Sequence, residues 1–185
     1  ASMWGRYGGH SDANLEEDLN VIKNSHLDVW DDLLGKIYDQ RGRMKVESDD
    51  LRGSGISGRF FTNFYIMLKH RSAQDWFNGL ELDEGSASSL STHRHHIFPK
   101  AFLNKIGLNE KNEKQRESIN EIANSALITG ATNLQISDKA PEVYFREVLD
   151  KYPNALRSQL IPENSELWKG ENFNEFLHVR RQLIA

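Results

Sequence analysis

Apolar residues at helical spacing dominate the first forty positions. One such stripe consists of Leu15, Leu19 and Ile22. Asn14, with Glu17 three positions later, is a capping-box arrangement, so we predict a helix from Asn14 to about Ser25. A second helix over residues 26–40 is predicted from the stripe of Leu27, Trp30, Leu33, Leu34 and Ile37.

The middle of the chain changes from helical to strand-like patterning. Residues 58–71 are too continuously apolar for a surface helix and predict a central buried helix. Residues 90–97 predict a strand, and the short apolar run 126–129 predicts a second, buried strand that Gly130 ends. A helix can begin at Thr132, after this second strand.

The remaining segments are predicted to be helical. The polar, lysine-rich stretch between the two strands predicts one or two helices. Pro141 suits the first turn of a further helix, which Pro153 stops. A last amphipathic helix is predicted from Phe173, Phe176, Leu177 and Leu183. The predicted fold class is therefore α+β and mainly α-helical.

Composition narrows the class of protein. The chain has 185 residues and no cysteine, which excludes Cys-ligated zinc, thiol catalysis and a disulfide framework. No apolar run reaches the ~20 residues that a membrane crossing needs, and no signal peptide is visible. We expect a cytoplasmic protein without a membrane segment.

Charge is unevenly distributed along the chain. The formal net charge is −4, and residues 1–40 carry 3 basic and 8 acidic side chains. Residues 41–71 carry 7 basic and 3 acidic side chains, and residues 93–116 carry 6 and 2. These two basic blocks are compatible with nucleic-acid binding, although ordinary solvated faces would look the same.

The second basic block begins with a histidine-rich segment. It contains His93, His95 and His96, and Asn124 and Asn133 follow nine positions apart. Imidazoles serve as metal ligands and as proton acceptors near neutral pH. Taken singly, a His-His pair is weak evidence, and each asparagine is more often a turn or cap residue. Their order and nine-residue spacing together resemble a metal-dependent nuclease core.

This order resembles the ββα-metal finger of the His-Asn-His (HNH) endonuclease superfamily. The resemblance is closer to the C-terminal nuclease portion of GmrSD-like restriction proteins. The shared words are His95-His96-Ile97-Phe98-Pro99-Lys100, Ile122-Ala123-Asn124-Ser125-Ala126-Leu127-Ile128-Thr129 and Thr132-Asn133-Leu134-Gln135-Ile136-Ser137-Asp138-Lys139. Arg6-Tyr7, Asp75-Trp76, Pro141 with Tyr144, and Phe176-Leu177 with Arg180 also look like that group.

The resemblance implies a ββα-metal core embedded in a helical bundle. The implied division is an N-terminal helical portion at 1–89, the nuclease core at 90–150, and a helical tail at 151–185 packed on the core. The implied activity is metal-dependent hydrolysis of phosphodiester bonds in DNA, within a restriction or anti-phage defence protein.

The resemblance also implies roles for single residues. His96 would be the general base, and Asn124 would orient it by pinning the loop before the second strand. His95 and Asn133 would ligate a divalent ion. Implied contacts with nucleic acid come from Lys100, Lys139, Arg94 and His93. Simple surface roles remain open for these last four.

The chain departs from the family pattern in two ligands. Its first ligand is His rather than the commoner acid, and its last is Asn rather than His. Mg²⁺ or Mn²⁺ is the expected ion, while a neutral ligand pair also suits Ni²⁺ or Zn²⁺. Adjacent residues of a regular strand face opposite ways, so His95 and His96 can serve one site only where the strand ends or bends.

The resemblance implies double-stranded DNA as the partner. GmrSD-like proteins carry an N-terminal nucleotide-binding domain with an Asp-Gly-Gln-Gln-Arg motif, which this sequence lacks, so we expect such a domain elsewhere in the same protein. A homodimer is a further expectation, because cutting both strands is easiest with two sites. Alternative functions are a non-catalytic nucleic-acid-binding or regulatory module, or an RNase.

Overall fold

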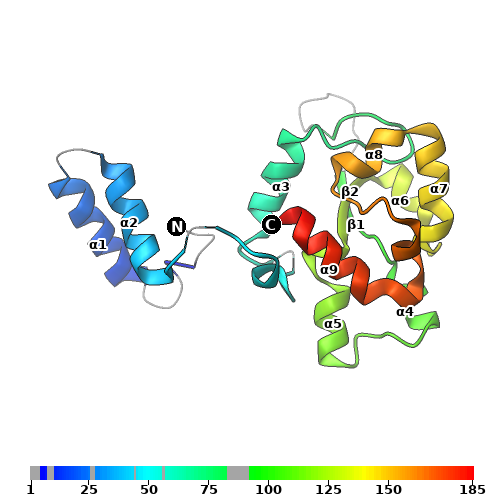
Figure 1. Cartoon of the computed structure of the whole chain (residues 1–185), viewed down its shortest axis with the longest axis horizontal. Helices are drawn as coiled ribbons and strands as arrows, with labels where there is room; N and C mark the ends of the chain where they lie inside the picture. The colour runs from blue at the N-terminus through cyan, green and yellow to red at the C-terminus, as the bar shows by residue number, and fades with distance from the viewer. Residues whose placement is uncertain (1–4, 8–10, 26–27, 44, 56, 83–91) are drawn as a thin grey trace. The chain divides into compact units, whose positions relative to one another are not determined.

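The computed structural model describes residues 5–7, 11–25, 28–43, 45–55, 57–82 and 92–185 (Figure 1). It divides into two compact units, Ala1–Val46 and Glu47–Ala185. The structure is mainly helical with one small two-stranded sheet, which confirms the α+β class. Among the described residues, no helix combines the length and apolar character that a membrane crossing requires.

The first unit is a helical hairpin. Helix α1 spans Ser11–Asn24 and α2 spans Val29–Arg41, with a connection short enough to make them antiparallel neighbours. Asp28 caps α2 by accepting hydrogen bonds from two backbone N–H groups. The predicted start of α1 at Asn14 is wrong, because the Asn14 side chain donates to the backbone oxygen of Arg6 instead of capping the helix.

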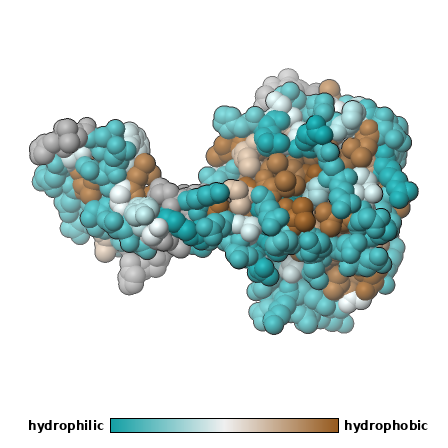
Figure 2. All heavy atoms as spheres, in the orientation of Figure 1, coloured by the Kyte–Doolittle hydropathy of each residue, from teal (hydrophilic) through white to brown (hydrophobic). Residues whose placement is uncertain are grey.

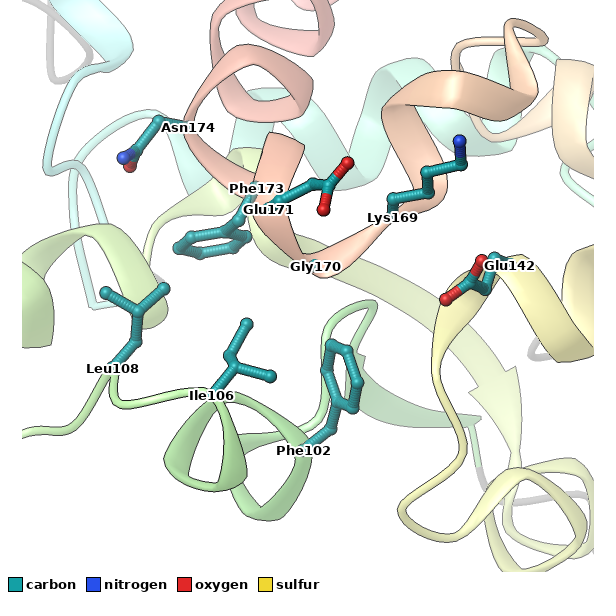
Figure 3. Close-up of a pocket in the computed structure, with 9 residues that line it drawn as sticks. All are labelled: Phe102, Ile106, Leu108, Glu142, Lys169, Gly170, Glu171, Phe173 and Asn174. Carbon is teal, nitrogen blue, oxygen red and sulfur yellow. The ribbon is translucent and has the colours of Figure 1, made fainter.

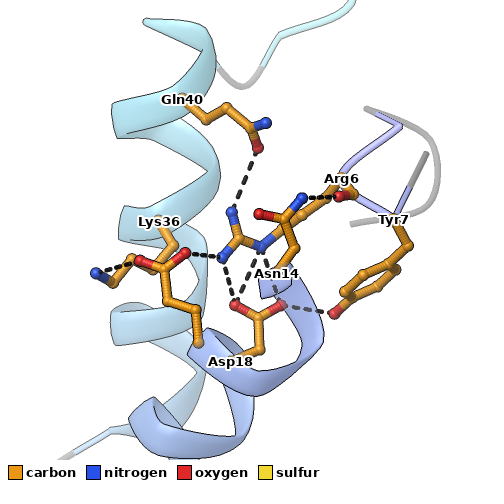
Figure 4. Close-up of polar contacts among 7 residues, drawn as sticks. Arg6, Tyr7, Asn14, Asp18, Lys36 and Gln40 are labelled. Carbon is orange, nitrogen blue, oxygen red and sulfur yellow. Dashed lines mark hydrogen bonds and ion pairs between the residues drawn. The ribbon is translucent and has the colours of Figure 1, made fainter. Parts of the chain in front are cut away.

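Ionic contacts fill the space between these two helices (Figure 4). The Arg6 guanidinium donates to Asp18 at 2.6–3.0 Å, to Glu17 at 2.9 Å and to Gln40 of α2 at 3.3 Å. Tyr7 also donates to Asp18, at 2.6 Å. Arg6 and Asp18 are both buried, and hydrogen bonds from Arg6 lower the pKa of Asp18. The hairpin is therefore held together by buried polar groups.

The described residues of the two predicted apolar stripes are mostly exposed, except that Ile37 is buried and Leu33 is half-buried. The exposed apolar side chains are Leu15, Leu19, Ile22, Trp30, Leu34 and Tyr38. Each of these residues comes one position after a more buried residue that lies at the interface of the two helices, such as Asp18 or Ile37. In an antiparallel pair this one-residue rotation places both exposed stripes on the same side. Figure 2 shows apolar residues at the surface of this unit.

The second unit contains the sheet and the remaining helices (Figure 1). Its strands are β1 (Thr92–His96) and β2 (Ser125–Thr129). Its α-helices are α3 (Phe61–His70), α4 (Lys100–Lys105), α5 (Glu113–Ile119), α6 (Gly130–Ile136), α7 (Pro141–Lys151), α8 (Pro153–Ser158) and α9 (Phe173–Ile184). Short 3₁₀ turns are η2 (Ser48–Leu51), η3 (Ile122–Asn124), η4 (Ser165–Trp168) and η5 (Gly170–Asn172).

Several predicted boundaries agree with these elements. Pro141 occupies the first turn of α7, and Pro153 begins α8 directly after α7 ends. Thr129 caps α6 by accepting a hydrogen bond from the Thr132 N–H, so this helix starts two residues earlier than predicted. Residues 90–91 of the first predicted strand lie outside the described residues. The predicted segments 90–150 and 151–185 both fall within the second unit.

The core of the second unit is rich in aromatic side chains. Trp76, Tyr144 and Phe145 contact one another at ring-centroid distances of 4.6–5.8 Å. Phe98 contacts Phe173 and Phe176 of α9. The expectation that α3 is the central buried helix is wrong. Only Phe64 and Leu68 of this helix are buried, and neither belongs to the main core cluster.

The sheet is antiparallel, with His95 opposite Ala126 and His96 opposite Ser125. Helix α6 packs against both strands. Successive side chains of a strand point to opposite faces of the sheet. His93 and His95 therefore lie on one face, while Arg94 and His96 lie on the other. The ring of His93 lies over the start of α6, where a Cβ added at Gly130 would be 3.1 Å from Nε2.

The outer edge of β2 is hydrogen-bonded by side chains. Arg180 of α9 donates to the carbonyl of Ser125 at 2.7 Å. Gln159 pairs with both the N–H and the carbonyl of Leu127, at 2.9 and 2.6 Å. Asp75 accepts from the N–H of Thr129 at 2.6 Å. Every residue of β2 is buried, so these side chains take the place of a neighbouring strand.

A substitution at Gly79 tests how tightly the turn after Asp75 is packed. This glycine has φ of +70°, and an added Cβ would lie 2.5 Å from the Tyr152 ring. Gly79→Ala should lower the free energy of unfolding by about 2–4 kcal/mol, from left-handed strain and overpacking together. Gly107→Ala is the matched control, since φ is +89° there but nothing lies within 4 Å. Urea denaturation measures both, and equal losses would contradict the packing argument.

Candidate functional site

Two predicted ligand residues meet between β1 and α6. His95 Nδ1 lies 2.8 Å from Asn133 Oδ1, within hydrogen-bond distance. His95 is fixed by strand pairing with Ala126, and Asn133 lies one turn into α6. The Thr129 cap positions that helix directly after β2. Local sequence features on both elements therefore bring the imidazole and the carboxamide together.

His95 lies in an aromatic setting. Its ring packs edge-on against Trp76 and Tyr144, at centroid distances of 6.0 and 6.2 Å. The residue is only 5% exposed, and burial lowers the pKa of His95 to about 4. Its Nε2 atom is buried and has no hydrogen-bond partner among the described residues. His95 is thus a neutral imidazole at physiological pH.

His96 is the last residue of β1 and faces the other side of the sheet. Its Nε2 lies 3.3 Å from Asn120 Oδ1, at the end of α5. Its Nδ1 makes no hydrogen bond to the described residues, and the residue is half-buried. Burial, and secondly the charge of Lys100, lower the pKa of His96. A neutral Nδ1 without such a bond can accept a proton.

Asn124 holds the turn that follows His96. Its Oδ1 accepts from the Phe98 N–H at 2.9 Å, and its Nδ2 donates to the carbonyls of Phe98 and Ile119. The backbone N–H of Ile97 donates to the Asn124 carbonyl. Asn124 is fully buried and all these contacts are to backbone. It therefore fixes the end of the strand and does not touch the His96 ring.

The four residues predicted to contact nucleic acid have different surroundings. Arg94 shares a sheet face with His96, and its buried Nε has no hydrogen-bond partner. Lys100 forms an ion pair with Glu110 at 2.7 Å. Lys139 follows α6 and is exposed. His93 lies on the His95 face, over Gly130.

The fit of a divalent ion rests on His95 and Asn133. Two ligand atoms at right angles around an ion, each ~2.1 Å away, are about 3.0 Å apart. The observed 2.8 Å separation matches this spacing. An ion on Nδ1 would leave the Nε2–H without the acceptor that metal-bound imidazoles usually have. Among the described residues, no group of three or more His, Cys, Asp or Glu side chains could hold an ion.

A cavity of about 730 Å³ lies elsewhere in the same unit (Figure 3). Phe102 of α4 and Ile106, which follows this helix, form part of its apolar floor, against Gly170. Glu142 and Glu171 line its rim. None of the predicted site residues lines this cavity, and two carboxylates at its rim disfavour a phosphate group. The candidate site is therefore the sheet end and not this cavity.

Some residues around the candidate site were not assigned roles from the sequence. Asn120 and its partner Glu110 were missed, because an asparagine that ends a helix gives no chemical signal by itself. Resemblance to GmrSD-like proteins was the only sequence signal for Asp75, Tyr144 and Arg180. In the structure Tyr144 donates to the Ile97 carbonyl at 2.6 Å, while Asp75 and Arg180 bond the edge of β2.

Comparisons with known proteins give one relative without a described activity. No protein-family model matches the chain, and no solved structure matches it. An uncharacterized protein of Methanocaldococcus jannaschii is 23% identical over 212 residues. That alignment covers 97% of this chain and 33% of that protein, so the chain spans about a third of the relative's length.

The pKa of His95 predicts a pH dependence of stability in the presence of a chelator. The unfolded residue titrates near 6.5 and the folded residue near 4, so the unfolded chain binds the proton first as pH falls. Its contribution is complete above pH ~6.5 and about 3 kcal/mol is lost towards pH 4.

Chemical denaturation at pH 7 and pH 4.5 measures this loss. The loss should shrink in His95→Gln and persist in His178→Gln, which changes an exposed histidine of α9. An unchanged loss in His95→Gln would assign the pH dependence to other groups.

Proposed function

We propose that this chain is a metal-dependent DNA endonuclease domain of the HNH type, in which β1, β2 and α6 form the ββα-metal core. The single observation that carries the proposal is the 2.8 Å approach of His95 to Asn133, next to a histidine whose Nδ1 makes no hydrogen bond to the described residues. Phosphodiester hydrolysis needs an activated water, neutralisation of the charge that develops at phosphorus, and a departing oxygen. The sheet end supplies groups for the first two needs.

His96 is the general base in this proposal. Its Nδ1 takes a proton from water while the water oxygen forms a bond to phosphorus. The bond from phosphorus to the leaving oxygen breaks, and that oxygen takes a proton from solvent. The lowered pKa of His96 supports this role, because the ring is neutral and able to accept a proton near pH 7.

His95 and Asn133 would hold the divalent ion, which neutralises charge on the phosphate when bound. Both ligands are uncharged, so much of the affinity must come from the phosphate oxygens themselves. Mg²⁺ and Mn²⁺ suit such shared coordination, because they retain water and bind phosphate oxygen. Ni²⁺ and Zn²⁺ are the alternatives favoured by the imidazole nitrogen.

Arg94 is the strongest of the proposed phosphate contacts. It lies two residues before His96 on the same sheet face and makes no hydrogen bond or ion pair to the described residues. Burial lowers the pKa of Arg94, as expected for a cation that lacks a partner. Lys100, Lys139 and His93 would add contacts along the duplex.

The end of β1 at His96 decides whether one phosphate can contact both His95 and His96. The rings face opposite sides of the sheet, but the ladder ends at His96 and the chain turns through Pro99. For one phosphate to be hydrolysed here, it must contact both rings at this end of the strand.

The cellular setting belongs to the same proposal. We infer a cytoplasmic restriction or anti-phage protein in which a nucleotide-binding domain precedes this chain. The 33% coverage of the archaeal relative leaves room for such a domain. A homodimer would supply one site for each DNA strand.

One observation favours a second candidate function. With two neutral ligands in the described part of the chain, the domain could bind nucleic acid without cleaving it. Binding to a duplex with no cleavage in Mg²⁺, Mn²⁺ or Ni²⁺ would support that module. Cleavage of RNA but not DNA in the same buffers would indicate an RNase.

Loss of the base should abolish cleavage of supercoiled plasmid. His96→Ala should slow nicking by about 10²–10⁴-fold, because the proton acceptor is removed. His95→Ala and Asn133→Ala should instead raise the Mn²⁺ concentration for half-maximal nicking by about tenfold or more. His178→Ala, at an exposed position, should change neither value. Undiminished nicking by purified His96→Ala would remove His96 from the mechanism.

Arg94 should contribute to phosphate binding. Arg94→Gln should weaken binding of a fluorescent duplex in a chelator and reduce the slope of log affinity against log salt by about 0.9. Arg146→Gln changes charge equally at an exposed position of α7 and is the matched control. Equal effects of the two variants in anisotropy titrations would mean that Arg94 acts only through net charge.

A further inference from the structure

A hydrogen-bonded chain of side chains runs from His96 to the start of α4. His96 Nε2 lies 3.3 Å from Asn120 Oδ1, and Asn120 Nδ2 donates to Glu110 Oε1 at 2.8 Å. Glu110 in turn accepts from Lys100 Nζ at 2.7 Å. Hydrogen bonds from Asn120 and Lys100 lower the pKa of Glu110, so it is a carboxylate. The chain therefore ends on a charge pair.

The donors and acceptors in this chain have only one consistent order. Asn120 Nδ2 donates both to Glu110 and to the carbonyl of Arg116, at 2.8 and 2.9 Å. Both partners are acceptors only, so the amide nitrogen must face them and Oδ1 must face the ring. His96 Nε2 therefore carries the proton, and the lone pair is on Nδ1.

We propose that Asn120 is the positioning residue of His96, and that Glu110 holds Asn120 in the required orientation. This inference rests on the proposed function, since it concerns the base of the hydrolysis. Asn120 fixes the Nε2–H form of the ring and its rotation, which leaves Nδ1 as the atom that accepts the proton. Neither residue belongs to the predicted set of His95, His96, Asn124 and Asn133.

A purely structural role fits these contacts less well. The backbone N–H of Asn120 already ends α5 by donating to Arg116 and Ser118, and Nδ2 only repeats the contact with the Arg116 carbonyl. Lys100 and Glu110 are 39% and 43% exposed, and exposed ion pairs contribute little to stability. What the side chains of Asn120 and Glu110 add is the orientation of a partly buried imidazole.

The tautomer of His96 can be read without any activity. In ¹⁵N-labelled protein at pH 8 with a chelator, two-bond ¹H–¹⁵N spectra distinguish Nε2–H from Nδ1–H rings. Wild-type His96 should be in the Nε2–H form. Asn120→Ala should give a mixture, because the acceptor for the Nε2–H group is lost.

Steady-state cleavage of a duplex supplies the second readout. Asn120→Ala should lower kcat by about tenfold with KM nearly unchanged, as for other residues that orient a functional histidine. A residue that only braced α5 would leave both kcat and the ring tautomer of His96 unchanged. Asn112→Ala is the control, because it removes the cap of α5 without contacting His96.

The outcomes separate the two proposals. A cleaving wild type whose Asn120→Ala variant keeps both its kcat and a pure Nε2–H ring overturns the positioning role alone. A wild type that cleaves neither DNA nor RNA in Mg²⁺, Mn²⁺ or Ni²⁺ overturns the proposed function, and with it the catalytic meaning of the contact. A wild-type Nδ1–H ring contradicts the assigned order of donors directly.

Discussion

The structure of the second unit depends on the side chains that supply hydrogen-bond partners to the backbone along the buried outer edge of β2. A two-stranded sheet is marginal by itself, and buried backbone groups without partners are costly. Here Asp75, Gln159 and Arg180 come from three separate segments and bond the groups that a third strand would bond. Arg180 stays protonated at neutral pH, although burial lowers its pKa to about 9. Its donors meet carbonyl oxygens only.

The same side chains set both halves of the candidate site. Asp75 accepts from the Thr132 hydroxyl as well as from Thr129, and so fixes the first turn of α6 that carries Asn133. Arg180 bonds the carbonyl of Ala123, next to Asn124, which holds the turn after His96. The distance between imidazole and carboxamide is therefore a consequence of core packing and not of the two residues alone.

Sequence patterns predicted what depends on local chemistry. The apolar run of β2, the proline that begins α7 and the meeting of His95 with Asn133 follow from propensity, capping and motif order. The Asn120 contact could not be predicted, because it joins a helix end to a strand end through folding. The outward stripes of the hairpin were misjudged for a related reason. Periodicity gives a helix its apolar side, but not which side its neighbour covers.

The hairpin of α1 and α2 has a thermodynamic consequence. Its cohesion comes from carboxylates around one guanidinium, whereas the second unit relies on aromatic packing. Because Arg6 and Asp18 are buried, added salt screens this cluster only weakly, and salts such as sulfate strengthen the apolar burial of the second unit. Acid removes the charge of Asp18 and leaves Phe98 or Trp76 untouched. The hairpin therefore depends on a charged cluster that acid discharges, whereas in the second unit acid acts through buried groups such as His95.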